Sequence, residues 1–141
     1  MTSGFPFVSM MRVGATVLIV DDHVAFREWA RALLEQGGYT VLGDVGDGGS
    51  AIEAVRRLRP EVVLLDVQLP DIDGFEVARR LRRHDLAPMV VLTSTRDAAD
   101  YGDRVANSAA LGFLAKDQLS SEALARLTDG RDSSNTRATP A

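Results

Sequence analysis

Polar residues with chemical potential stand at widely separated points of this sequence, each where an apolar run ends. Asp21 and Asp22 follow the run TVLIV, and Asp66 ends the run VVLLD. Thr93 ends the run MVVLT, and Lys116 follows the segment LGFLA. Carboxylates that are crowded together repel one another, which raises the cost of ionising them unless a cation lies between them. If the fold brings these residues together, they predict a site for a divalent cation.

The donor types narrow both the metal and the reaction. The chain has no cysteine, so a thiolate nucleophile and a cysteine zinc site are excluded. Oxygen donors suit Mg²⁺, with Mn²⁺ as the alternative, and bound Mg²⁺ keeps positions for water and a phosphoryl oxygen. A carboxylate can attack phosphorus, while a lysine and a hydroxyl neutralise and orient the transferring oxygens. We therefore predict phosphoryl transfer, with Asp66 as the nucleophile and Thr93 and Lys116 as its catalytic partners.

One histidine lies beside the acidic pair. His23 follows Asp22 directly and could be considered as a further metal ligand. A single histidine next to hard oxygen donors is, however, more typical of a helix-entry surface. We therefore leave His23 out of the predicted site.

Short, β-rich apolar runs alternate with segments of helical periodicity from Thr16 onward. The apolar runs predict buried strands, and the intervening three- to four-residue spacing predicts helices. Ser50 is the expected N-cap of the second helix, and Trp29 is expected in the core. The expected strands cover 16–20, 39–45, 62–66, 89–93 and 111–115, and the expected helices cover 25–36, 50–58, 74–83, 98–109 and 120–127.

This alternation predicts an α/β fold, a doubly wound parallel sheet of five strands with helices on both faces. Ligands bind such sheets beyond the carboxyl ends of the strands, which places all the polar residues named above on one edge. The length of 141 residues suits one domain. We expect that domain over residues 14–128, with a flexible N-terminal segment at 1–13 and a flexible C-terminal tail at 129–141, because both ends lack periodicity.

Composition excludes several classes of partner. The formal net charge of −4 opposes binding to phosphate backbones, and no basic stripe with interleaved aromatic residues is visible, so we expect no direct nucleic-acid contact. No apolar run approaches the roughly 20 residues that span a bilayer, so we expect no membrane segment. The start of the chain lacks the features of a signal peptide. The predicted location is the cytoplasm.

The segments VDDH, LLDVQLPDIDG, VVLTS and GFLAK together resemble the response-regulator receiver family of two-component signalling, over residues 16–127. The resemblance implies a flavodoxin-like or CheY-like sheet with strand order 2-1-3-4-5. It also implies that Asp66 takes a phosphoryl group from a sensor histidine kinase or phosphotransfer protein. By the same resemblance Asp22, Asp66 and the backbone carbonyl of Gln68 hold Mg²⁺, Asp21 supports the metal mainly through water, and Thr93 and Lys116 contact the phosphoryl group.

The resemblance also implies a switch. Phe113 occupies the position of an aromatic residue that turns inward as the Thr93 hydroxyl moves toward the phosphate, although a plain core role is an equal alternative. The responding surface would comprise residues 98–109, 111–115 and 120–127, and would bind a downstream protein partner or a second copy of the chain after phosphorylation. Lys116 is followed by Asp117 instead of the family's frequent proline, a pattern similar to receivers of helix-turn-helix transcription regulators. Only about a dozen polar residues follow the last expected helix, so we expect a separate protein to carry the output.

Two other functions compete with this interpretation. The fragment Asp71-Ile72-Asp73-Gly74 superficially resembles the nucleophile loop of aspartyl-phosphate phosphatases that depend on Mg²⁺. It follows a turn instead of a buried strand, which disfavours that class. The second alternative is an interaction module that keeps the fold without being phosphorylated. Its weakness is that every chemical landmark is retained.

Overall fold

A computed structural model of the chain describes residues 14–138. Its centre is a parallel sheet with the strand order β2-β1-β3-β4-β5, which confirms the predicted α/β fold and strand order. The strands are β1 (Thr16–Val20), β2 (Thr40–Val45), β3 (Val62–Asp66), β4 (Met89–Ser94) and β5 (Gly112–Ala115). The order reverses between β1 and β3, so the candidate site is expected at their carboxyl ends.

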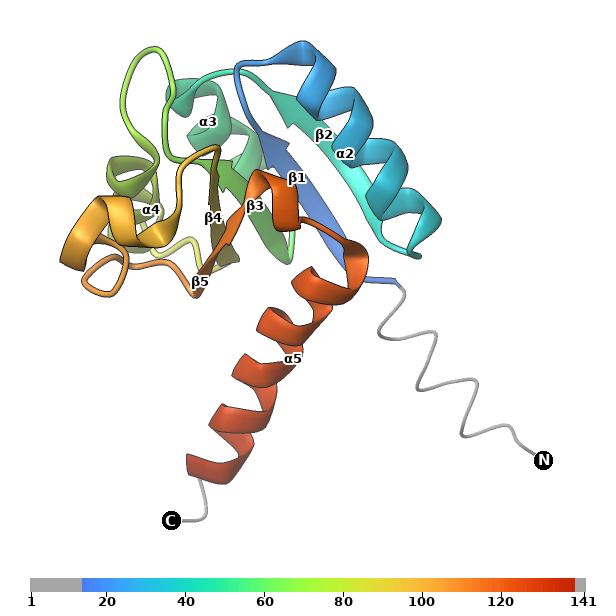
Figure 1. Cartoon of the computed structure of the whole chain (residues 1–141), viewed down its shortest axis with the longest axis vertical. Helices are drawn as coiled ribbons and strands as arrows, with labels where there is room; N and C mark the ends of the chain where they lie inside the picture. The colour runs from blue at the N-terminus through green and yellow to red at the C-terminus, as the bar shows by residue number, and fades with distance from the viewer. Residues whose placement is uncertain (1–13, 139–141) are drawn as a thin grey trace.

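Helices cover both faces of the sheet (Figure 1). They are α2 (Val24–Gln36), α3 (Gly48–Leu58), α4 (Gly74–Arg83) and α5 (Ser121–Ala138). Residues of α3 and α4 pack with Leu18 and Leu65 on one face, and residues of α2 and α5 pack with Ile19 and Leu64 on the other. Neighbouring residues of a strand therefore contribute to opposite cores, which explains why β1 is apolar throughout and why β3 is apolar up to Asp66.

The central strand shows how burial positions the chemistry. All five residues of β3 are buried, including Asp66 at its carboxyl end. Each large apolar side chain removed from water contributes about 1.5–3 kcal/mol, so this strand cannot slip without a large loss. In the register of the sheet, Asp66 pairs with Thr93 of β4. The buried strands thereby fix where the polar residues at their ends emerge.

The segment predicted as a helix over 98–109 is different in the structure. A 3-10 helix, η1 (Ala98–Arg104), is followed by turns up to the start of β5. Gly102 has φ 59° and ψ −131°, which are not helical values, so η1 consists of two short helical stretches that meet at a kink at this residue. Glycine reaches this backbone region at little cost and has poor helix propensity, so it interrupts the helix in the middle. The prediction of a regular helix here was wrong.

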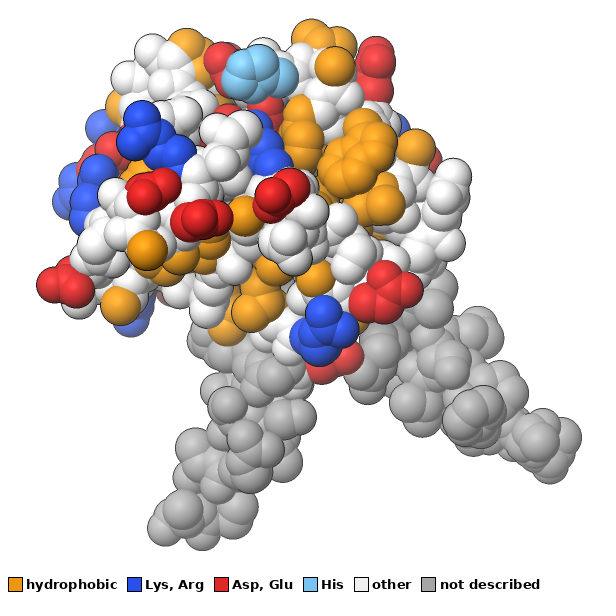
Figure 2. All heavy atoms as spheres, in the orientation of Figure 1, with side chains coloured by type: hydrophobic (Ala, Val, Ile, Leu, Met, Phe, Trp, Pro, Cys, Tyr) orange, Lys and Arg blue, Asp and Glu red, His pale blue; other side chains and the backbone are white. Residues whose placement is uncertain are grey.

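Three smaller expectations also differ. Trp29, predicted in the core, is 48 % exposed on α2. Figure 2 shows hydrophobic side chains gathered over α2 on the face turned to the viewer. The N-cap of α3 is Asp47, whose side chain accepts a hydrogen bond from the Ser50 backbone, so Ser50 itself is not the cap. Aspartate is as good a cap as serine, and the helix begins two residues earlier than predicted.

The last helix continues to Ala138, beyond the predicted end at Leu127. Proline, which would stop a helix, first occurs after this point at Pro140. The predicted tail at 129–141 therefore falls mostly in helical backbone, while the segment 1–13 and residues 139–141 lie outside the described residues. Within residues 14–138, none of the helices has the length and apolar character needed to cross a membrane.

Candidate functional site

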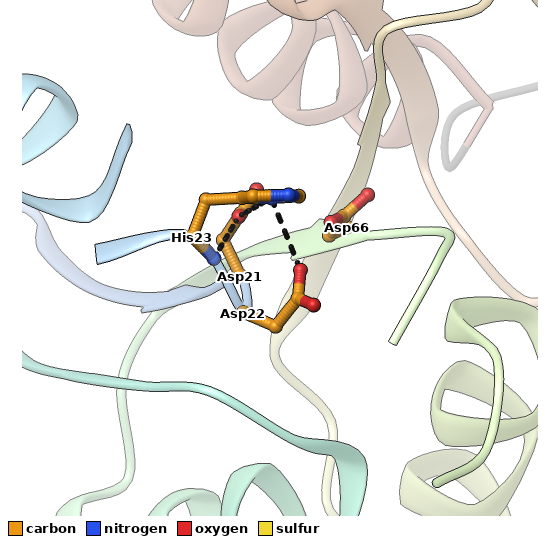
Figure 3. A group of neighbouring side chains, drawn as sticks. All are labelled: Asp21, Asp22, His23 and Asp66. Atoms are coloured by element: carbon orange, nitrogen blue, oxygen red, sulfur yellow. Dashed lines mark hydrogen bonds and ion pairs between the residues drawn. The ribbon is translucent and has the colours of Figure 1, made fainter. Parts of the chain in front are cut away.

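The carboxyl ends of β1 and β3 bring together acids that are far apart in the sequence (Figure 3). Asp21, Asp22, His23 and Asp66 each offer a ligand atom, and these atoms lie within 4.8 Å of one another. Asp21 and Asp66 are buried, whereas Asp22 and His23 are exposed. The cluster thus has a buried floor of two carboxylates and an open side that faces solvent.

Asp66 lies in an environment that disfavours its charge. Its burial, followed by repulsion from Asp21, raises the pKa of Asp66 to about 6, while the charge of Lys116 and hydrogen bonds from Gln68 and Lys116 act in the opposite direction. Carboxylates side by side cannot all stay ionised without a compensating cation. The electrostatics of this edge therefore favour a ligand that carries positive charge.

Lys116 supplies part of that charge. Its Nζ lies 2.5 Å from Asp21 Oδ2 and 3.4 Å from Asp66 Oδ2, and its side chain is 11 % exposed. The contact with Asp21 lacks hydrogen-bond geometry, so Oδ2 of that residue accepts no hydrogen bond from the described residues. The stem of Lys116 reaches the site past Phe26, with Nζ 4.6 Å from the ring centroid. One ammonium group thus bridges two buried carboxylates.

Thr93 pairs with Asp66 in the sheet, and Phe113 lies on β5, where it pairs with Leu92. Thr93 is buried, and its Oγ1 has no hydrogen-bond partner within the described part of the chain. A buried hydroxyl without a partner costs about 1–3 kcal/mol, which a ligand oxygen could offset. Phe113 is half-buried, and its ring lies 6.0 Å from that of Tyr101. Both the switch and the core interpretation of Phe113 remain consistent with this position.

The loop after β3 is held by backbone and helix-cap contacts. Gln68 donates its backbone N–H to Asp66 Oδ1 at 3.2 Å. Asp71 accepts hydrogen bonds from the backbone N–H groups of Gly48 and Gly49, at 2.8 and 2.9 Å, and so joins the loop to the start of α3. A Cβ at Gly74 would lie 2.5 Å from the Asp66 carbonyl oxygen. The close turn therefore requires glycine at that position.

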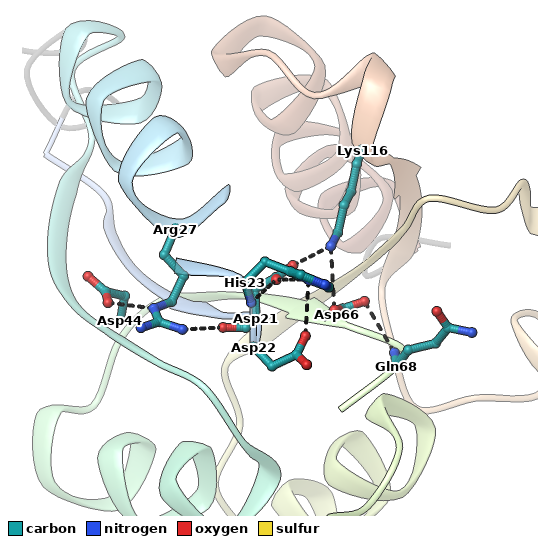
Figure 4. A network of polar contacts seen from close by, with 8 residues as sticks. All are labelled: Asp21, Asp22, His23, Arg27, Asp44, Asp66, Gln68 and Lys116. Carbon is teal, nitrogen blue, oxygen red and sulfur yellow. Dashed lines mark hydrogen bonds and ion pairs between the residues drawn. The ribbon is translucent and has the colours of Figure 1, made fainter. Parts of the chain in front are cut away.

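Two residues that sequence reasoning left out also take part. His23 Nδ1 lies 3.1 Å from one oxygen of Asp21 and 3.1 Å from one oxygen of Asp22. Arg27 donates to the carbonyl oxygen of Asp21 at 2.6 Å and to Asp44 at 2.8 Å (Figure 4). The position of Arg27 one helical turn after His23 is the only sequence signal that could have indicated this contact.

The residues present fit a hard divalent cation. Three of the four ligand groups are carboxylates, and the fourth is His23. Within the described residues, one buried carboxylate oxygen and one buried hydroxyl lack hydrogen-bond partners, and Asp66 has a raised pKa that positive charge would lower. Oxygen donors in this arrangement match Mg²⁺ or Mn²⁺. Asp22 and Asp66 are the carboxylates that could hold such an ion, with Asp21 beside them and Gln68 bonded to Asp66 through its backbone N–H.

Comparison with known proteins settles the family. The family model for the response regulator receiver domain matches residues 17–128. The chain belongs to the response regulator receiver domain family. It is 37 % identical over 120 residues to the transcriptional regulatory protein NarL of Mycobacterium tuberculosis, a match covering 82 % of this chain and 56 % of that protein. The DNA-binding transcriptional activator EvgA of Escherichia coli is 31 % identical over 99 residues, covering 70 % of this chain and 48 % of that protein.

Solved receiver structures agree with this assignment. The signal receiver domain of NarL from Mycobacterium tuberculosis matches with a TM-score of 0.69 and 36 % identity, over 75 % of this chain and 86 % of that one. A CheY-like receiver domain protein from Methanospirillum hungatei matches with a TM-score of 0.74 at 19 % identity, over 88 % of this chain and 98 % of that one, which supports the fold alone. The chain spans about half the length of the curated relatives it matches.

Proposed function

We propose that this receiver accepts a phosphoryl group on Asp66 from a sensor histidine kinase or a phosphotransfer protein, with Mg²⁺ or Mn²⁺ bound at the acidic edge. The observation that carries the proposal is the position of Lys116, whose Nζ lies between Asp21 and Asp66 at 2.5 and 3.4 Å. A buried acid pair with one shared ammonium is costly as a purely structural feature. It is well suited to receive an anionic group together with a cation.

The reaction follows from the groups around Asp66. A carboxylate oxygen of Asp66 attacks phosphorus, the new O–P bond replaces the P–N bond of the donor histidine, and the departing imidazole keeps the bonding pair and takes up a proton. Mg²⁺, when bound, would neutralise charge on the phosphoryl oxygens. Lys116 can form an ion pair with the same oxygens, and the unpartnered Thr93 hydroxyl can donate a hydrogen bond to them.

The later hydrolytic step uses the same residues: water attacks phosphorus, the O–P bond to Asp66 breaks, and inorganic phosphate leaves while the carboxylate is restored. Lys116 stabilises charge on the departing phosphoryl group, so the protein slowly removes its own phosphate. Gln68 is exposed at the mouth of the site, where it can influence access of water. Such a protein is a phosphoacceptor with slow autophosphatase activity and not a turnover enzyme.

The output would pass through the side of the sheet beyond β4. We propose that movement of Thr93 toward the phosphate frees space that Phe113 and its neighbour Tyr101 fill, so that η1, β5 and α5 present a different surface. Tyr101 supports this proposal because its hydroxyl lies 2.6 Å from Oγ of Ser94, the residue next to Thr93. The partner of that surface is a downstream protein or a second copy of the chain, and the proposed location is the cytoplasm.

The phosphatase alternative finds no support in the geometry. Both aspartates of the fragment 71–74 serve other elements: Asp71 accepts from the start of α3, and Asp73 caps α4. Asp73 also pairs with Arg104 at 3.1 Å. Neither carboxylate is among the ligand atoms of the acidic cluster. Asp66 is therefore the nucleophile to test.

The decisive experiment is the intact mass of the protein after incubation with acetyl phosphate. We expect one added phosphoryl group when Mg²⁺ is present, and none after chelation. Asp66→Asn should abolish the added mass while circular dichroism stays unchanged, because asparagine has the same shape but cannot form an acyl phosphate.

Lys116→Ala provides the second arm of this experiment. It should leave labelling detectable but weaken the conformational change that follows labelling, because the ammonium links the phosphoryl group to β5. Equal labelling of Asp66→Asn and the wild-type protein would overturn the assignment of the nucleophile. Labelling that does not depend on a divalent cation would overturn the metal site.

A further inference from the structure

The backbone of the acidic pair is held from the side of β2. The N–H of Asp21 donates to the carbonyl oxygen of Val45 at 3.0 Å. The carbonyl oxygen of Asp21 accepts from Arg27 Nη1 at 2.6 Å. Both polar groups of one residue are therefore bonded to the end of β2 or to a side chain anchored there, while its carboxylate points toward Lys116 (Figure 4).

Arg27 is itself fixed in place. Its Nε donates to Asp44 Oδ1 at 2.8 Å, and the other oxygen of Asp44 accepts from Arg31 Nη2 at 2.9 Å. The Arg27 side chain is only 18 % exposed. Burial alone would raise the pKa of Asp44, but hydrogen bonds from Arg31 and Arg27 outweigh it and hold the pKa below its ordinary value. The carboxylate thus remains an ionised anchor at neutral pH.

Space for the guanidinium depends on a glycine. A Cβ at Gly46 would lie 3.2 Å from Arg27 Nη1 and 3.8 Å from both the Asp21 carbonyl oxygen and Asp22 Cα. The planar guanidinium fits between the β2 end and the acidic pair because residue 46 has no side chain. A planar fork with several donors can bridge a carboxylate and a carbonyl at once, which a lysine ammonium does less well.

We propose that Arg27 is a positioning residue for the metal site, acting through the peptide that joins Asp21 to Asp22. That peptide is planar, so a hydrogen bond to its carbonyl oxygen sets the direction in which both neighbouring side chains leave the backbone. Arg27 touches neither acid's carboxylate in the described structure; its partners are a backbone oxygen and Asp44. The inference rests on the proposed function, because it assigns a role toward the cation of that site.

A positioning role and a purely electrostatic role predict opposite changes in cation affinity when Arg27 is removed. Arg27 carries a positive charge close to a cation site, so its charge alone weakens cation binding, and its loss would tighten it. Loss of a positioning contact instead weakens binding, as removal of groups that orient metal ligands commonly does by tenfold or more. The direction of the change therefore separates the two roles.

The test is titration of the metal-free protein with Mn²⁺, with free Mn²⁺ measured by electron paramagnetic resonance and Mg²⁺ added as a competitor. Arg27→Gln should weaken Mn²⁺ binding by about tenfold. Arg31→Gln is the matched control, because it also removes one guanidinium from Asp44 but has no contact with Asp21. It should change the Kd by less than about twofold.

Labelling by acetyl phosphate gives an independent readout. For Arg27→Gln the Mg²⁺ concentration for half-maximal labelling should rise, while the rate at saturating Mg²⁺ returns close to that of the wild-type protein. A structural defect alone would lower the saturated rate as well. If Arg27→Gln proves unfolded by circular dichroism, Gly46→Ala replaces it. The added methyl group would push Arg27 Nη1, 3.2 Å away, slightly from the Asp21 carbonyl oxygen, and should weaken Mn²⁺ binding by about twofold.

The outcomes separate the two claims. Wild-type protein that binds no Mn²⁺ and is not labelled would overturn the proposed function. Wild-type protein that binds Mn²⁺, together with Arg27→Gln that binds it equally well or more tightly, would overturn only the positioning role. An equal loss in Arg27→Gln and Arg31→Gln would overturn it too, because the effect would then belong to the Asp44 network as a whole.

Discussion

The two sides of the sheet's carboxyl edge are built in different ways. On the side of β1 and β3, side chains from other elements hold the backbone: Arg27 of α2 bonds to the Asp21 carbonyl, and Asp71 ties its loop to the start of α3. On the side of β4 and β5, the bonds within residues 95–111 are mostly local, such as the reciprocal cap between Asp97 and Asp100. The acid side is therefore rigidly placed, whereas the segment 95–111 can change its path without breaking the sheet.

Aromatic rings form one of the contacts between the two sides. Tyr101 lies between Phe75 and Phe113, with ring centroids 5.6 and 6.0 Å away. Its hydroxyl contacts Ser94 at the end of β4, next to Thr93. A rigid site joined by few contacts to an adaptable segment is a suitable arrangement for passing a local chemical change to a surface.

The largest loss of stability is expected from a substitution on the side of β1 and β3, at Gly74. A Cβ at Gly74 would lie 2.5 Å from the Asp66 carbonyl oxygen and 2.9 Å from Val67 Cα, and backbone atoms cannot move aside cheaply. Gly74→Ala should therefore lower the free energy of unfolding by about 2–3 kcal/mol, measured by urea denaturation.

Two other glycines serve as controls for this substitution. Gly49→Ala meets only ordinary contacts of 3.6 and 3.7 Å, and should be neutral or stabilise the protein by less than about 1 kcal/mol. Gly102→Ala meets nothing within 4 Å, but its φ of +59° strains any other residue by about 1–2 kcal/mol. Equal losses in all these variants would contradict the distinction between packing and backbone strain.

A pH series should sharpen the electrostatic part of the comparison. Burial and the charge of Asp21 raise the pKa of Asp66 to about 6 in the folded state, against about 4 when unfolded. The stability that its proton supplies is present below the unfolded pKa and is lost as pH rises through about 6. The side chain in Asp66→Asn stays neutral at every pH. The free energy of unfolding of this variant, relative to that of the metal-free wild-type protein, should therefore be roughly 1 kcal/mol higher at about pH 8 than at about pH 5.

Urea unfolding in the presence of a chelator measures this difference. Chelation keeps divalent cations from masking the repulsion between Asp21 and Asp66. A stability difference that does not change with pH would show that Asp66 is not electrostatically strained in the folded protein.

A smaller loss of stability is expected from a substitution on the side of β4 and β5. Tyr101→Phe keeps the ring contacts but removes the hydroxyl that lies 2.6 Å from Ser94 Oγ. Ser94 Oγ still accepts from the Arg96 backbone at 3.0 Å, so the loss should be only about 1 kcal/mol. Hydrogen exchange should quicken in residues 97–104 while the amides of β3 keep their protection. A double-mutant cycle with Ser94→Ala checks that the two hydroxyls act as a pair.

The smallest effect is expected at the exposed contact between the two sides. Arg104 lies 4.3 Å from the centroid of Phe75 and 3.1 Å from Asp73, but its side chain is 58 % exposed. Arg104→Ala should cost no more than about 0.5–1 kcal/mol in thermal or urea unfolding. A loss as large as that of Gly74→Ala would mean that the segment 95–111 is held as firmly as the acid side.

Sequence reasoning worked well where burial is uniform. Apolar runs that end in or are followed by polar residues predicted β1, β3, β4 and β5, and the strand–helix alternation placed β2. Helical periodicity predicted the helices that pack on the sheet, because burying an apolar face leaves few alternatives for these segments. The same reasoning failed for residues 98–109, where Gly102 and local bonds decide the backbone, and for Trp29, which α2 leaves exposed. The presence of hydrophobic residues in a helix does not by itself indicate whether the largest of them lies on the buried or on the exposed side.

By itself, the sequence determined the parallel α/β sheet and the residues that end its strands, because those depend on local patterns of apolar and polar residues. Only the tertiary structure decided that Lys116 bridges Asp21 and Asp66, and that Arg27 and Asp44 hold the acidic pair from behind. These contacts join residues up to 95 positions apart, as between Asp21 and Lys116, and depend on side-chain directions that no periodicity encodes. Distances between charged atoms exist only once the strands are paired, and the pKa of Asp66 depends on those distances.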